Sequence, residues 1–169
     1  MWGTDLTTVA TGEGQAAVFI AVDHCSAECV GIHASAHATR NEALEPIRQA
    51  IRLNFGAFGK DVATGLKIRH DHGSQYMSRD FQREIRFLGA ESSPAFIRAP
   101  EGNGCAERFI RTLKENLLWT RWFETIEDLR QALLEFQQTY NEQWLIERHG
   151  HRPPADVRRE QTQTMNQAA

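Results

Sequence analysis

Three carboxylates in this sequence have types and spacing suited to holding metal ions: Asp5, Asp71 and Glu107. Asp5 lies in an alternating stretch that predicts a strand, Asp71 ends a second predicted strand, and Glu107 falls in the first turn of a predicted helix. Between Asp71 and Glu107 stand 35 residues. Carboxylate oxygens are preferred ligands of Mg²⁺. Two such ions, about 4 Å apart, can stabilise both the attacking and the leaving oxygen of a phosphoryl displacement. The pattern therefore predicts a site for phosphodiester chemistry.

Each of these acids also has an ordinary interpretation. An aspartate at a strand end is commonly a turn former, and a glutamate in a first helical turn commonly complements the helix dipole. For any single residue the ordinary interpretation is favoured. The three contexts together favour the metal site.

The elements that must position these acids can be predicted from periodicity and turn signals. The run 16–22 is continuously apolar, which is typical of a strand buried on both faces. Thr39 predicts a helix N-cap, with Glu42 completing a capping box and Pro46 near the first turn. Ser78 predicts a second N-cap. The expected strands cover residues 2–10, 15–24, 28–35, 66–71 and 89–93, and the expected helices 40–55, 79–88, 104–120 and 125–144.

This order of elements predicts the fold class. Three strands joined by tight turns should pair antiparallel, and the later strands alternate with helices. We therefore expect an α/β protein, with a mixed sheet of about five strands whose first three are antiparallel, flanked by helices. Acids at adjacent strand ends can converge in such a sheet.

The helix that carries Glu107 has two stripes. The apolar stripe predicted to face the core consists of Ala106, Ile110, Leu113 and Leu117. Glu107, Arg111 and Lys114 lie at i, i+4 and i+7, about a quarter-turn away from it. This second stripe could look into a cleft at the edge of the core. Taken alone, it could equally be a solvated Glu–Arg pair.

With these residues in view, the chain resembles the catalytic core of insertion-sequence transposases of the retroviral-integrase-like superfamily, over about residues 1–158. The segment 2–7 resembles the family's first-Asp strand, 70–76 its second-Asp motif, and 103–114 its Glu-helix with a basic residue seven positions after the Glu. The ends 140–141 and 152–154 also match, and so does the 35-residue spacing.

The resemblance implies a ribonuclease H-like fold and DNA strand transfer. Hydrolysis frees a 3′-hydroxyl at the element end, and that hydroxyl then attacks a target phosphodiester. It implies that Asp5, Asp71 and Glu107 are the catalytic residues and bind Mg²⁺, with Mn²⁺ as a substitute and two ions expected. The implied partners are transposon-end and target DNA and further copies of the chain. Candidate DNA contacts are Lys114, Arg111, Arg108 and His72.

Two departures from the family pattern stand out. His70 and His72 flank Asp71 where the family usually has a small hydroxyl residue and an Asn or Gln. The family's N-terminal helical DNA-binding segment is also missing, so we expect the chain to be a fragment of a longer protein. Residues 159–169 form a polar tail that we expect to be disordered.

Composition bounds the other possibilities. The 169 residues carry a net charge of −3, with 41% hydrophobic and 24% charged residues, as in a soluble globular domain. An acidic balance is unusual for a strong DNA binder, so most DNA affinity is expected to come from another domain or subunit. No apolar run suggests a membrane span. We expect reduced thiols and a bacterial, cytoplasmic, nucleoid-associated protein.

Two alternative functions stay open. The chain could be a non-catalytic DNA-binding or assembly module from a decayed transposase, or a ribonuclease H-like nuclease that cuts without joining. A zinc site is disfavoured because residues four apart along a strand do not converge on one ion; its candidates are Cys25, Cys29, His33 and His37. Four aromatic side chains could stack on DNA bases, but aromatic residues at such helical positions more often belong to the core or to a subunit interface. They are Trp119, Trp122, Phe123 and Trp144.

Overall fold

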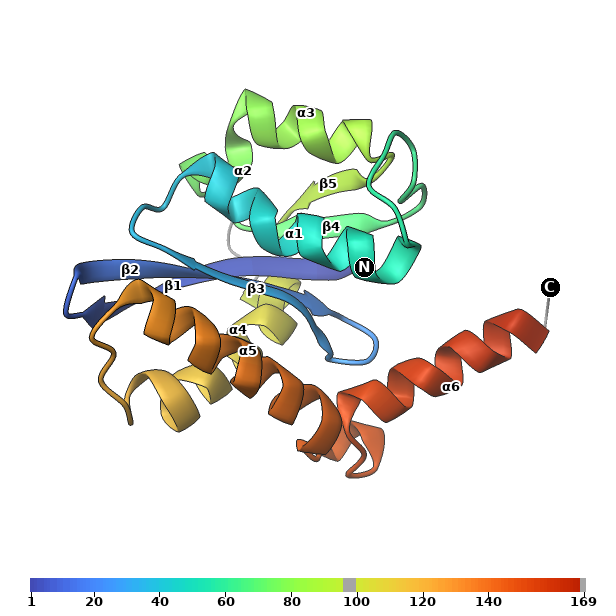
Figure 1. The fold of residues 1–169 in the computed structure, drawn as a ribbon. Helices are drawn as coiled ribbons and strands as arrows, with labels where there is room; N and C mark the ends of the chain where they lie inside the picture. The colour runs from blue at the N-terminus through green and yellow to red at the C-terminus, as the bar shows by residue number, and fades with distance from the viewer. Residues whose placement is uncertain (96–99, 168–169) are drawn as a thin grey trace.

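The protein is a five-stranded mixed sheet with helices on both faces (Figure 1). The computed structural model describes residues 1–95 and 100–167. The strand order is β3-β2-β1-β4-β5; the first three strands pair antiparallel, and β1, β4 and β5 pair parallel. This confirms the predicted fold class. The strands are β1 (Trp2–Thr11), β2 (Gly14–Asp23), β3 (Cys29–Ser35), β4 (Lys67–His70) and β5 (Glu91–Pro94).

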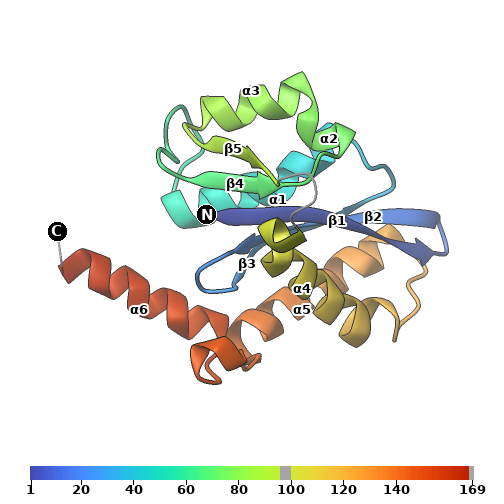
Figure 2. The ribbon, with the colours of Figure 1, turned by 180° about the vertical axis from the view of Figure 1, so that it is seen from behind.

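The helices divide between the two faces of the sheet. α1 (Arg40–Phe55), α2 (Ser74–Met77) and α3 (Arg79–Phe87) lie on one side, and α4 (Gly104–Leu113) and α5 (Ile126–Gln143) on the other, as both views show (Figures 1 and 2). Short 3₁₀ turns cover Pro100–Asn103 and Glu147–His149. None of the described helices is long and apolar enough to span a membrane.

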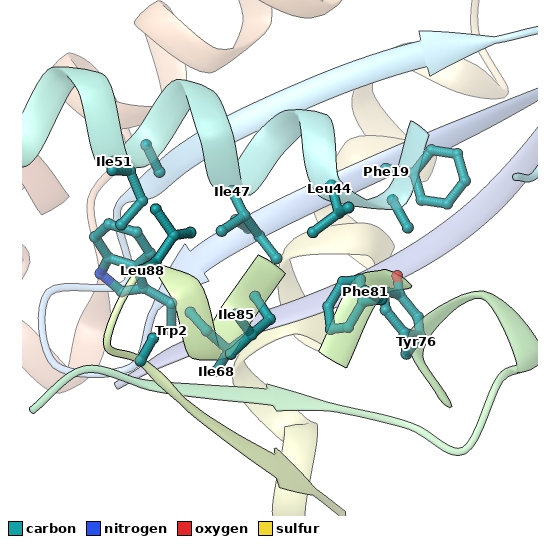
Figure 3. Packing of buried hydrophobic residues seen from close by; sticks show 14 of the residues in the cluster. Trp2, Phe19, Leu44, Ile47, Ile51, Ile68, Tyr76, Phe81, Ile85 and Leu88 are labelled. Carbon is teal, nitrogen blue, oxygen red and sulfur yellow. The ribbon is translucent and has the colours of Figure 1, made fainter. Parts of the chain in front are cut away.

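Strand β2 separates two hydrophobic cores, because successive side chains of a strand point to opposite faces. Phe19 and its odd-numbered neighbours face α1–α3, where they pack with Leu44, Ile47 and Phe81 (Figure 3). Ile20 and its even-numbered neighbours face α4 and α5. The continuous apolar run of β2 is thereby explained.

Helix α1 follows its predicted bounds but differs in detail at its N-terminus. Thr39 caps it by accepting a hydrogen bond from the Glu42 backbone N–H. The capping box is not completed, since the Glu42 carboxylate pairs with His33 of β3 instead. Pro46 lies inside the helix and not in its first turn. Its carbonyl presses against Gly31, where an added Cβ would lie 2.0 Å away.

The helix expected over residues 104–120 changes its winding halfway. α4 ends at Leu113, and a π-helical turn continues from Lys114 to Leu118. A π turn holds more residues than an α turn, so it rotates the following side chains. As a result Leu118 is buried and Leu117 only partly so, which corrects the predicted apolar stripe.

Residues 159–167 of the polar tail, which was predicted to be disordered over 159–169, are helical in the structure, and residues 168–169 lie outside the described residues. α6 (Pro154–Gln167) begins with a proline, which suits a first helical position. Its first turns dock through buried Val157 and through Arg158, which pairs with Glu28. Beyond these contacts the helix extends away from the body of the protein (Figures 1 and 2).

Candidate active site

Asp5 and Asp71 lie at the same level of two neighbouring parallel strands. β1 pairs with β4 through Trp2 opposite Ile68 and Gly3 opposite Arg69. Asp5 stands two residues after Gly3, and Asp71 stands two residues after Arg69. Counted on from these pairs, Asp5 and Asp71 are at equivalent positions of neighbouring parallel segments. Asp71 directly follows β4, whereas Asp5 lies inside β1 and not at the strand end that the sequence predicted.

Helix α4 is fixed against β1 by a residue that the sequence reasoning did not single out. The Asn103 side-chain amide donates a hydrogen bond of 3.2 Å to the Thr4 carbonyl, next to Asp5. Gly3 permits this approach, since an added Cβ there would lie 2.7 Å from Asn103 Oδ1. Glu107 is one helical turn beyond Asn103 and so faces the same region. The signal in the sequence that could have indicated this role is an Asn directly before the predicted helix.

One pocket gathers most of the predicted site. It has a volume of about 480 Å³, and its lining includes Asp5, Glu107, Arg111 and Lys114. Arg111 is tied to Glu115 by an ion pair of 2.8 Å. Since Arg111 is already paired, Lys114 is the better placed of the two cations for a substrate phosphate.

The electrostatics of the pocket appear most clearly at Asp5. Burial raises the pKa of Asp5 from 3.8 to about 6. A hydrogen bond from the Leu6 backbone N–H lowers the pKa, whereas the neighbouring charges of Asp71 and Glu107 raise it and Lys114 lowers it. Asp5 thus lies within electrostatic reach of the other two acids. A cation bound beside Asp5 would offset their repulsion.

Asp71 is held by its own turn and by a buried histidine. Its Oδ1 accepts a hydrogen bond of 2.7 Å from the Gly73 backbone N–H. His70 is fully buried, with Nδ1 2.6 Å from the Asp71 carbonyl oxygen and Nε2 2.7 Å from Ser92 Oγ. Burial lowers the pKa of His70. A neutral imidazole can donate from one nitrogen and accept at the other, so His70 links β5 to the backbone of Asp71.

Some predicted site residues do not come together. Asp71 is not part of the pocket lining, and neither are Arg108 and His72. Burial raises the pKa of both Cys105 and Tyr140, and the charge of Arg108 partly offsets that rise, so Arg108 lies on another side of α4. His72 is exposed in the turn after β4.

The residues present fit a divalent ion in chemistry and charge. They supply hard carboxylate oxygens at one end of the sheet, and a cation would relieve the repulsion at Asp5. Among residues 1–95 and 100–167, however, no group of three or more His, Cys, Asp or Glu side chains is arranged to hold a metal ion. Two of the four residues considered for zinc have other surroundings. Cys29 is buried, and His33 pairs with Glu42.

Comparison with known families agrees with this fold and this arrangement of acids. A family model described as an integrase core domain matches residues 1–100, and a second model with the same description matches residues 91–154.

Curated relatives are bacterial transposases. A transposase for insertion sequence element IS904 from Lactococcus lactis is 30% identical over 141 residues, covering 83% of this chain and 53% of the relative. A transposase for IS629 from Shigella sonnei is 25% identical over 157 residues, covering 93% of this chain and 51% of the relative. The chain thus spans about half the length of these relatives.

Solved structures share the fold. The catalytic core domain of BIV integrase superposes with a TM-score of 0.67 at 20% identity, covering 98% of this chain and 97% of that one. The HTLV-2 integrase catalytic core, solved in complex with magnesium, gives a TM-score of 0.66 at 18% identity, covering 92% and 93%.

The sheet topology and the likeness to integrase catalytic cores define the fold as a ribonuclease H-like mixed sheet flanked by helices. Within that fold class, the chain belongs to the integrase core domain family. Its transposase relatives connect it to insertion sequences.

Proposed function

We propose that this chain is the catalytic core of an insertion-sequence transposase, which hydrolyses a phosphodiester at a DNA end. The freed 3′-hydroxyl then attacks a target phosphodiester, and the 3′-oxygen of the cut target strand leaves. The observation that carries the proposal is the pocket shared by Asp5, Glu107 and Lys114, with Asp71 in register beside Asp5. The family match and the transposase relatives support the choice of DNA as substrate.

Asp5, Asp71 and Glu107 would hold two Mg²⁺ ions, or Mn²⁺ in their place. When bound, the metal supplies neutralisation of phosphate charge and activation of the attacking oxygen. The protein's own contribution is positional. Asn103 holds the start of α4 against β1, His70 holds the backbone of Asp71, and Lys114 receives a phosphate oxygen.

The test is nicking and joining of a labelled DNA duplex that carries a free 3′-hydroxyl end, with Mg²⁺ or Mn²⁺. Wild type should give both products, and Glu107→Gln should abolish both while its thermal unfolding stays cooperative. Glu135→Gln, an exposed change of the same chemistry on α5, is the matched control. Activity of Glu107→Gln at the wild-type rate would refute the assignment. Nicking without joining would indicate a nuclease.

A second candidate is a DNA-binding or assembly module without catalysis. It is favoured by the finding that the described acids do not form a closed metal site. The variant Lys114→Ala tests DNA binding independently of catalysis. Loss of one phosphate contact should reduce the salt dependence of duplex binding by about one unit of slope, whether or not turnover occurs. An unchanged slope would remove Lys114 from the DNA contacts.

We also propose that the chain self-associates and acts on DNA in the bacterial cytoplasm, at the nucleoid. Support comes from the neighbouring HTLV-2 core, which was solved in trimeric and dimeric forms, and from the bacterial relatives. Sedimentation of the purified chain over a concentration series tests self-association. A monomer at all concentrations would refute it for this segment.

A further inference from the structure

Two tryptophans are exposed on the segment that joins the π turn to α5. Trp119 is 70% exposed and Trp122 is 59% exposed, whereas Phe123 beside them is 1% exposed. Large aromatic side chains that stay in water cost free energy unless they bind something. These two therefore invite a functional explanation.

The segment is anchored to the sheet and is not a loose loop. The Gly12 backbone N–H donates a hydrogen bond of 2.9 Å to the Phe123 carbonyl. The Ile126 backbone N–H donates one of 2.7 Å to Glu13 Oε2 at the same hairpin. Buried Phe123 and these two bonds hold the backbone, so the outward position of the tryptophans is built into the fold.

Trp119 connects two neighbouring pockets. It lines the pocket that contains Asp5, Glu107 and Lys114, and it also lines a second pocket of about 480 Å³. The second pocket is formed by residues of β1 and of the connecting segment: Thr8, Val9, Ala10, Leu118, Trp119, Thr120, Arg121 and Trp122. Trp119 therefore stands between the candidate active site and the pocket that Trp122 lines, and these two neighbouring pockets are called the path below.

The chemistry of this path suits a nucleic acid strand. Among the residues that line the second pocket, none is acidic, and Arg121 supplies a cation. Lys114 supplies another on the side of the candidate active site. The β1 backbone adds polar groups here, since among the described residues β4 pairs with β1 only at Trp2 and Gly3. Aromatic faces between cations are the usual platform for unpaired bases.

We propose that this path, lined by Trp119, Arg121 and Trp122, binds an unpaired single-stranded segment of DNA that leaves the candidate active site, with its bases stacked on the two indole rings. The inference rests on the proposed function for the identity of the polymer. Unpaired DNA is favoured over duplex because the base faces in a duplex are already covered by their neighbours, so an indole ring cannot stack on them.

The test measures binding without catalysis. Fluorescein-labelled single-stranded DNA and the duplex of the same sequence are titrated with Asp71→Asn protein in EDTA, and anisotropy is recorded. In this background, Trp119→Ala and Trp122→Ala should each weaken single-strand binding about tenfold, the effect of losing one stacked base. Duplex affinity should change less than twofold. Trp119→Phe should restore most of the binding, because it keeps an aromatic face.

Leu53→Ala, which removes an exposed apolar side chain from α1, is the control and should change neither affinity. Equal losses for single strand and duplex, or no loss for either tryptophan, would overturn the inference. So would a change in the sedimentation of the DNA-free protein on Trp119→Ala, which would make the surface a self-association interface. Binding is read without turnover, so failure of the nicking and joining assay would leave this result standing.

Discussion

Replacing Asp5 by asparagine should stabilise the metal-free protein while abolishing its proposed catalysis. Asp5 is mostly buried and lies near the charges of Asp71 and Glu107, and these causes raise its pKa from 3.8 to about 6. An acid whose pKa is raised by folding binds its proton more tightly in the folded chain. Its ionisation therefore opposes folding.

The size and the pH window follow from these two pKa values. A tenfold difference in proton affinity corresponds to about 1.4 kcal/mol, so ionised Asp5 destabilises the folded protein by about 3 kcal/mol at most. Well below pH 3.8 the carboxyl is protonated in both states, and the penalty is absent. The penalty grows as the pH rises from 3.8 to about 6, and it is complete above about pH 7.

The assay is urea denaturation in EDTA, from pH 4 to pH 8, of wild type, Asp5→Asn and the exposed control Glu135→Gln. Asparagine keeps an oxygen for the Leu6 N–H bond but carries no charge. The stability gain of Asp5→Asn should be about 0.5 kcal/mol at pH 4 and reach about 2–3 kcal/mol at pH 7.5, and the control should show no such dependence. A gain equal at both pH values, or no gain at pH 7.5, would refute the electrostatic reasoning.

Two further substitutions test the packing and hydrogen bonds that hold the fold around the candidate site. His70→Leu should cost about 2 kcal/mol or more in urea denaturation, because the Ser92 hydroxyl and a backbone carbonyl lose a buried partner. Exposed His72→Ala should change stability by less than about 0.5 kcal/mol, and equal effects would contradict the role of His70. Gly31→Ala should lower the free energy of unfolding by about 2 kcal/mol or more, since the new methyl meets a carbonyl of α1 at 2.0 Å. Gly59→Ala, with open space around it, should be tolerated, and a stable Gly31→Ala would show that α1 shifts freely.

Local sequence signals were sufficient for most of the secondary structure. The apolar run of β2 and the caps Thr39 and Ser78 predict elements that the structure contains nearly within the expected bounds. These signals are local because a cap or a strand period involves only neighbouring residues.

The differences arose where contacts between distant segments decided the outcome. Glu42 left its capping box for His33 of β3. Pro46 was accepted inside α1, where its carbonyl packs on Gly31. Polar α6 became ordered through the contact of Arg158 with Glu28. None of these partners is near in sequence, so no periodicity could have indicated them.

The candidate site also depends partly on local sequence patterns and partly on tertiary contacts. The sequence alone indicated Asp5, Asp71, Glu107 and Lys114 as candidates, because acids in or after predicted strands and an i+7 basic residue on a helix are local patterns. Their roles are the proposals that the assays above test. Only the tertiary structure decided that Asp5 is buried enough to resist ionisation, that Arg108 faces away, and that Trp119 borders the carboxylate pocket. Burial and proximity depend on how segments far apart in the chain pack together. The π turn after α4 is an example, because Leu118 is buried there in place of Leu117.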